Sequence, residues 1–117
     1  MLGALARLFR PKPPEPVWLE VAALRQRLAN AAPPLVVDVR GPDEFDGPLG
    51  HIEGSLNAPL PELAAHQPEI IAADRPVVCV CLTDRRSAAA AALLMAAGLG
   101  DVTVLRGGMK AWREAGL

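Results

Sequence analysis

The sequence lacks a charge bias. Its 117 residues include 12 Lys and Arg against 13 Asp and Glu, which gives a formal net charge of −1. That balance excludes a polyelectrolyte, and it gives no support for a nucleic-acid-binding surface or a polybasic membrane patch. We therefore expect no nucleic acid partner, and we expect whatever the protein binds to be recognised locally.

Cysteine is scarce, and long apolar runs are missing. The only cysteines, Cys79 and Cys81, are two residues apart and could form a disulfide only with strain. A secreted disulfide scaffold is therefore not expected, and reduced thiols in the cytoplasm are expected. Arg7 and Arg10 interrupt the apolar stretch near the start, so no run approaches the roughly 20 residues of a membrane span.

The length fits one globular domain. Prolines at positions 11, 13, 14 and 16 disfavour both helix and sheet, so residues 1–16 are predicted to form a Pro-rich tail that is extended or disordered. An alternative for this tail is a weakly amphipathic turn that touches a membrane or a partner. The folded domain is predicted to span residues 17–117.

Short β-branched runs alternate with helical sequence along this domain. Runs at residues 35–39, 76–81 and 102–105 and a brief one at 55–57 predict strands, and helices are expected at 18–28, 42–45, 61–66, 87–97 and 109–115. Strands that alternate with helices predict an α/β fold. We expect a small, mainly parallel sheet of about five strands, flanked by helices on both faces.

Cys81 is expected at the carboxyl end of a buried strand, where open α/β sheets bind ligands. The residues that follow it are Leu82, Thr83, Asp84, Arg85 and Arg86, and then Ser87, which we predict as the N-cap of the next helix. Loop amides, a helix dipole and two guanidinium groups would together favour a nucleophilic thiolate. The alternative is that Cys81 is a small buried hydrophobic residue, which is also the main expectation for Cys79, with a resolving thiol as the second.

Several polar residues are predicted to support the structure. Asp38 and Arg40 flank one residue of a strand, so their side chains point the same way and are expected to form ion pairs that fix neighbouring loops. His51 is expected to be a hydrogen-bonded structural histidine, because no second ligand stands at metal-binding spacing around it. Arg86 is expected either to contact an anionic ligand or to pair internally with a carboxylate such as Asp38.

Four motifs resemble the rhodanese-like sulfurtransferase family, and the resemblance covers most of the chain from residue 17 to 117. They comprise residues 36–40 with 44–45, residues 50–57, residues 81–87, and residues 106–109 with Trp112. The resemblance implies a small sheet wrapped by helices and a persulfide on Cys81. It further implies that an anionic sulfur donor such as thiosulfate binds the loop 82–87, that cyanide, a thiol or a protein sulfur acceptor removes the sulfur, and that no metal or other cofactor is required.

One position departs from the family pattern, because Asp84 stands where many members have glycine. A carboxylate there is expected to reduce the positive field and to restrict a backbone that glycine would leave free. Two other functions stay open. A cell-cycle-type phosphatase or arsenate reductase also uses a cysteine at such a loop, but its family has five residues between cysteine and arginine, whereas four separate Cys81 from Arg86. The second open function is that of a non-catalytic rhodanese-like binding module.

Overall fold

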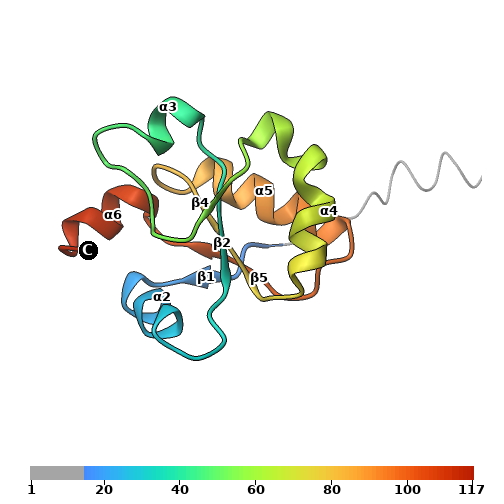
Figure 1. Cartoon of the computed structure of the whole chain (residues 1–117), viewed down its shortest axis with the longest axis horizontal. Coiled ribbons are helices and arrows are strands. Elements are labelled where there is room, and N and C mark those ends of the chain that lie inside the picture. The colour runs from blue at the N-terminus through green and yellow to red at the C-terminus, as the bar shows by residue number, and fades with distance from the viewer. Residues whose placement is uncertain (1–14) are drawn as a thin grey trace, which may run out of the picture.

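Five short strands form one parallel sheet in the computed structural model, which describes residues 15–117 (Figure 1). The strands are β1 (Trp18–Leu19), β2 (Leu35–Asp38), β3 (Leu56–Asn57), β4 (Val77–Val80) and β5 (Val102–Leu105). Their order is β1-β5-β4-β2-β3, and all neighbouring pairs are parallel. The predicted parallel sheet of about five strands is therefore confirmed, with β4 at its centre.

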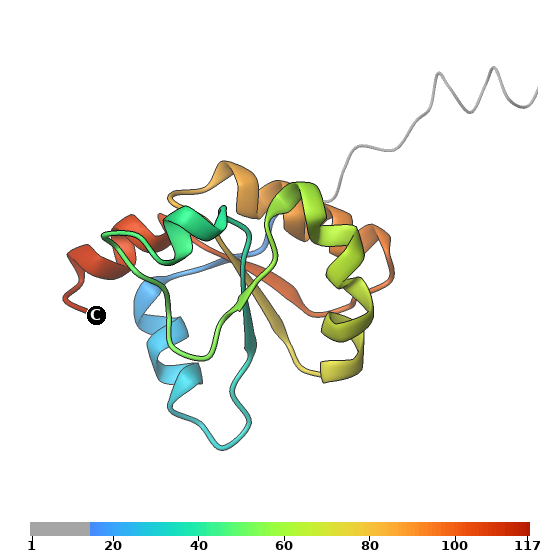
Figure 2. The same ribbon diagram turned by 45° about the horizontal axis from the view of Figure 1, so that its top comes forward.

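Helices cover both faces of the sheet, as predicted. They are α2 (Val21–Leu28), α3 (Pro42–Phe45), the 3-10 helix η1 (Leu60–Glu62), α4 (Leu63–Ala73), α5 (Arg85–Ala96) and α6 (Gly108–Glu114). Figures 1 and 2 show α4 and α5 on one side of the strands and α2 on the other, with α6 beyond the sheet edge where β5 ends. No helix within residues 15–117 is long and apolar enough to cross a membrane.

Strand alternation divides the core into two layers. In a strand, successive side chains point to opposite faces. One layer packs against α4 and α5 and contains Val37, Cys79, Val104 and the strand-end Cys81. The other packs against α2 and α6 and contains Val36, Val78, Val80, Leu105, Leu24, Met109 and Trp112. Because both faces are buried, these strands are continuous apolar runs in the sequence.

Two predicted elements differ from the structure. Trp18 and Leu19 were expected to begin a helix, but they pair with β5 as the edge strand β1, and the helix begins only at Val21. Two residues are too few to show a period, so sequence spacing could not separate this strand from a first helical turn. Helix α4 also continues through Pro68 to Ala73, past the predicted end at residue 66. Residues 1–14 of the predicted tail lie outside the described part.

A buried ion pair holds the segment that follows β2. Arg40 donates from Nη2 and Nε to Asp38 at 2.7 and 3.0 Å, and both side chains are almost completely buried. The same guanidinium donates to the carbonyls of Gly50 (2.7 Å) and Glu44 (3.2 Å). Asn57 of β3 donates to the backbone carbonyls of Asp38 and Arg40. The pair therefore connects β2, β3 and the loop after α3 beside the carboxyl edge of the sheet.

Asp38→Asn is expected to lower the free energy of unfolding by about 3 kcal/mol or more, because it leaves the buried Arg40 guanidinium without its counter-charge. Urea unfolding followed by circular dichroism measures the change. Asp43→Asn, at an exposed carboxylate on α3, is the matched control and should change the value by less than about 0.5 kcal/mol. A loss below 1 kcal/mol in Asp38→Asn would contradict this account of the pair.

Candidate functional site

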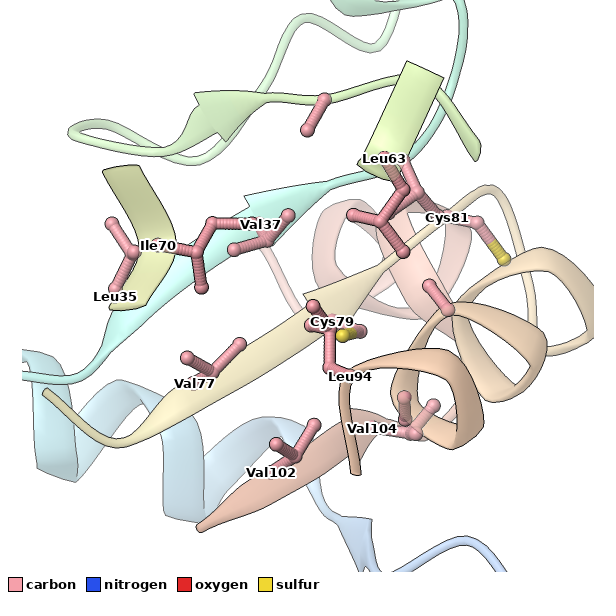
Figure 3. Close-up of a cluster of buried hydrophobic side chains, with 14 residues drawn as sticks. Leu35, Val37, Leu63, Ile70, Val77, Cys79, Cys81, Leu94, Val102 and Val104 are labelled. Carbon is pink, nitrogen blue, oxygen red and sulfur yellow. The ribbon is translucent and has the colours of Figure 1, made fainter. Parts of the chain in front are cut away.

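Cys81 directly follows the central strand β4, at the carboxyl edge of the sheet. Strand β4 lies between β2 and β5, so the segments after those two strands flank the cysteine on either side. In Figure 3, Cys79 lies within the cluster of aliphatic side chains, and Cys81 lies at the end of the cluster beside the loop. Cys81 is 2% exposed, whereas the next residue, Leu82, is 39% exposed. Cys81 is therefore buried, whereas the loop that follows it begins at the surface.

The loop after Cys81 is shorter than predicted. Helix α5 begins at Arg85, and its N-cap is Asp84, so the prediction of Ser87 as the N-cap is wrong. Ser87 lies in the first turn of α5, fully buried, with Oγ 3.2 Å from Cys81 Sγ. Its hydroxyl also donates to the Asp84 carbonyl at 3.1 Å. A serine inside a helix can bond to a backbone carbonyl three residues earlier. The presence of a serine therefore did not identify the residue at which the helix begins.

The carbonyl groups of the loop face the start of α6. Cys81 O accepts the Met109 N–H at 2.9 Å, and Leu82 O accepts the Lys110 N–H at 3.1 Å. A Cβ at Gly108 would lie 2.3 Å from Cys81 O and 2.6 Å from both Leu82 O and Thr83 O. Gly108 also has a φ of +58°. Only glycine fits here, and the three successive carbonyls converge on it.

The amide groups of the same loop face the other way. In a planar trans peptide, the N–H points opposite to the carbonyl of the same peptide, so the N–H groups of residues 82–84 point away from α6. Within residues 15–117, the N–H groups of residues 82–87 have no hydrogen-bond acceptor. The contact between Cys81 Sγ and Ser87 Oγ joins the residue before this row to the last residue of the row. Such a row of free amides at a helix start is an anion-binding nest.

Arg86 takes one of the two roles expected for it, an internal pair with a carboxylate, although the partner differs from the example named. Arg86 donates from Nη1 and Nη2 to the Glu44 carboxylate at 2.7 and 3.0 Å, so it pairs with α3 and not with Asp38. The hydrogen bond from Arg86 lowers the pKa of Glu44, and the bond to Glu44 raises the pKa of Arg86. Arg85 is exposed, and no carboxylate in the described part of the chain pairs with it. Of the two arginines, Arg85 is therefore the one whose charge is not paired with a carboxylate in this part of the chain.

The Asp84 side chain forms a hydrogen bond on the side of the loop where the carbonyls face α6. Its Oδ1 accepts the Gly107 N–H at 2.7 Å, in the turn between β5 and α6. Its φ is −133°, which an L-residue adopts freely, so the predicted backbone restriction is wrong. This bond was not predicted, and for Arg86 a carboxylate partner was predicted but not its identity as Glu44. The partners are 23 and 42 residues apart in the sequence, and no local pattern relates them.

The remaining singled-out residues lie away from the sulfur or within the core. His51 bonds through Nδ1 to the Phe45 carbonyl at 2.9 Å, and its ring stacks on Phe45 with centroids 3.6 Å apart. Cys79 is fully buried, and this burial, with a smaller contribution from Cys81, raises its pKa to about 12. Among residues 15–117, no three His, Cys, Asp or Glu side chains gather closely enough to hold a metal ion.

Comparisons with known proteins agree with the geometry. The family model of the rhodanese-like domain matches residues 20–115. A sulfurtransferase of Allochromatium vinosum is 39% identical over 99 residues, which cover 85% of this chain and 90% of that protein. The thiosulfate sulfurtransferase GlpE of Pseudomonas aeruginosa is 39% identical over 94 residues, with 78% of each chain covered. The uncharacterised protein YqhL of Bacillus subtilis is 42% identical over 77 residues, which cover 66% of this chain and 59% of YqhL.

A solved structure extends the match to three dimensions. The crystal structure of a rhodanese-related protein from Thermoplasma volcanium superposes with a TM-score of 0.73 at 31% identity. The match covers 86% of this chain and 93% of that protein. The predicted fold and the predicted resemblance are both confirmed by these comparisons.

The two thiols are expected to differ in reactivity. Iodoacetamide at pH 8 should add one carbamidomethyl group to the folded protein, on Cys81, because the pKa of about 12 keeps the buried Cys79 protonated. Intact mass followed by peptide mapping locates the adduct. Protein unfolded in guanidinium chloride is the control and should take two groups. An adduct on Cys79 before Cys81 in the folded protein would contradict this expectation.

The Glu44–Arg86 pair is expected to make stability depend on pH in the acid range. The pKa of Glu44 is lower in the folded protein than its usual 4.5, so the pair stabilises the fold above that pH and is lost as pH falls through the folded value. Both side chains are about 40% exposed, which limits the effect to about 1 kcal/mol or less.

Comparing the wild type with Glu44→Gln by urea unfolding from pH 3 to pH 7 tests this expectation. The difference in the free energy of unfolding should be constant above pH 5 and should shrink towards pH 3. Asp46→Asn, at an exposed carboxylate just after α3, is the matched control and should give a difference that does not follow this course. A Glu44→Gln difference that grows on acidification would refute the assigned sign.

Proposed function

The chain belongs to the rhodanese-like domain family, and from that premise we propose that it transfers sulfane sulfur through a persulfide on Cys81. The donor is an anion such as thiosulfate, and the acceptor is cyanide or a thiol. The observation that carries the proposal is the row of unpaired amides at residues 82–87 beside the Cys81 sulfur. A negatively charged terminal sulfur is the group that such a row would stabilise.

The reaction consists of two displacements at sulfur. The Cys81 thiolate attacks the outer sulfur of thiosulfate, a new S–S bond forms, and the S–S bond of the donor breaks so that sulfite leaves with the electron pair. Cyanide or a thiolate then attacks the outer sulfur of the persulfide, and Cys81 leaves as a thiolate. With cyanide the product is thiocyanate. Atoms and electrons balance over the two steps without an added oxidant.

Each neighbouring group has a part in this scheme. The free amides hold the charge of the bound anion and then of the persulfide. Arg85 attracts the donor, because its charge has no carboxylate partner within residues 15–117. Ser87 Oγ, 3.2 Å from the sulfur, can donate its hydrogen to a thiolate when it releases the Asp84 carbonyl. The Glu44–Arg86 pair fixes the first turn of α5.

The location and partners form part of the same proposal. Transfer requires a free thiol at Cys81, and both cysteines are free in the structure. A cytoplasm keeps such thiols reduced, so we place the activity there. Beyond the small-molecule donor and acceptor, a protein thiol is a further acceptor, because Cys81 is followed directly by the exposed Leu82.

The phosphatase alternative is less well supported. Phosphoryl transfer needs an arginine that grips the oxygens of a dianion. Arg86 is committed to Glu44 in α3, and it stands one residue closer to the cysteine than in those phosphatases. The alternative of a non-catalytic module is also less well supported. It would assign no role to the arrangement of Cys81, Ser87 and the unpaired amides.

Incubation with thiosulfate is expected to increase the intact mass of the protein by one sulfur atom, and cyanide should remove that increase. Cys81→Ser should abolish the mass gain and the production of thiocyanate while leaving the fold intact. Cys79→Ser is the matched control. It places a hydroxyl in the core at a cost of roughly 1 to 3 kcal/mol, yet its folded fraction should still take up sulfur.

Two outcomes would contradict the proposal. One is thiocyanate production that survives in Cys81→Ser. The other is hydrolysis of an aryl phosphate by the wild type at a rate above that of sulfur transfer to cyanide, which would favour the phosphatase alternative instead.

A further inference from the structure

The carboxylate of Asp84 lies on the side of the loop that faces away from the unpaired amides. Its Oδ1 bonds the Gly107 N–H, and Gly107 belongs to the same short segment that binds the loop carbonyls. We propose that Asp84 is a positioning residue that fastens the loop to the turn between β5 and α6. In this role Asp84 orients the loop amides. Its negative charge does not act by reducing the positive field that attracts the anionic sulfur donor. The inference rests on the proposed function.

Three hydrogen bonds join the loop to this segment in sequence. Met109 N–H binds Cys81 O, Lys110 N–H binds Leu82 O, and Gly107 N–H binds the Asp84 side chain. The first two fix the start of the loop. The Asp84 bond fixes its end, at the N-cap of α5, where no backbone bond to α6 is formed within the described residues. Without that carboxylate, the far end of the loop would lose its contact with α6.

The Asp84 bond is suited to this role. At 2.7 Å it is the shortest of the three, and its acceptor is ionised, which makes such bonds stronger than neutral ones. Gly107 has a φ of +79° and is the N-cap of α6. The carboxylate therefore satisfies a backbone donor that the start of a short helix would otherwise leave unpaired. This one hydrogen bond thus fixes the end of the loop after Cys81 and pairs a backbone N–H at the start of α6.

Two substitutions of Asp84 separate its effect on the orientation of the loop amides from the effect of its negative charge on the donor. Asp84→Asn removes the charge but keeps a carbonyl oxygen at the same place, so the bond to Gly107 can persist. Asp84→Ala removes both. If Asp84 acts mainly through its charge, the two variants should behave alike and bind thiosulfate more tightly. If it acts as a fastener, Asp84→Asn should resemble the wild type and Asp84→Ala should not.

The experiment measures amide hydrogen exchange at Gly107 and the rate of persulfide formation per folded Cys81 with thiosulfate. In Asp84→Ala we expect Gly107 exchange to accelerate about tenfold, and the rate of persulfide formation and the kcat for thiocyanate production to fall about tenfold, the effect of losing one charge-assisted bond. In Asp84→Asn all three should stay within about threefold of the wild type. Asp101→Ala, at an exposed carboxylate on the opposite edge of the sheet, is the matched control and should change none of them.

A merely structural role would lower the melting temperature of Asp84→Ala without this fall in kcat at 25 °C, and that result overturns the proposal. So does equal Gly107 exchange in all variants, or a lower KM for thiosulfate in both Asp84 variants. If Asp84→Ala does not fold, Asp84→Gly removes the same acceptor and takes its place. If the wild type forms no persulfide, the proposed function fails, while the exchange at Gly107 still decides whether Asp84 fastens the loop.

Discussion

The carbonyls of Cys81, Leu82 and Thr83 all face the backbone at Gly108, and two of them are hydrogen bonded to the N–H groups that follow it. Because peptides are planar, this contact also decides where the amides of the loop point. The free amides of the loop therefore point away from α6 because the carbonyls of the same peptides face it. Arg86, Glu44 and Asp84 secure the ends of the loop, and the buried Asp38–Arg40 pair secures the neighbouring segment.

Much of this architecture was predictable from the sequence because its causes are local. Apolar β-branched runs set strands β2, β4 and β5, and the helical stretches between them imply parallel pairing. The position of Cys81 at the end of a strand followed from the same pattern. The short strand β1 was missed, because its two residues carry no periodic signal and its pairing with β5 bridges most of the chain.

The finer details of the site depend on contacts between distant segments. Serine is a common N-cap, so Ser87 was given that place, yet its hydroxyl bonds back to Asp84 within the helix. Counting charges gave the loop two arginines and one aspartate, but Arg86 is neutralised by Glu44 and Asp84 binds a backbone amide. The charge that faces a ligand is therefore set by which partner each side chain finds, and composition does not contain that information.

The order of the segments along the chain has a consequence for biosynthesis. Cys81 and its loop leave the ribosome before residues 107–110, which bind the carbonyls of Cys81 and Leu82 and the side chain of Asp84. Strand β5, which carries that segment, also pairs with β1 from the other end of the domain. A nascent chain that ends before Gly107 therefore lacks the bonds that join the loop after Cys81 to the start of α6. If Cys81 transfers sulfur as proposed, a chain without the final helix lacks the contacts that orient the amides beside the sulfur.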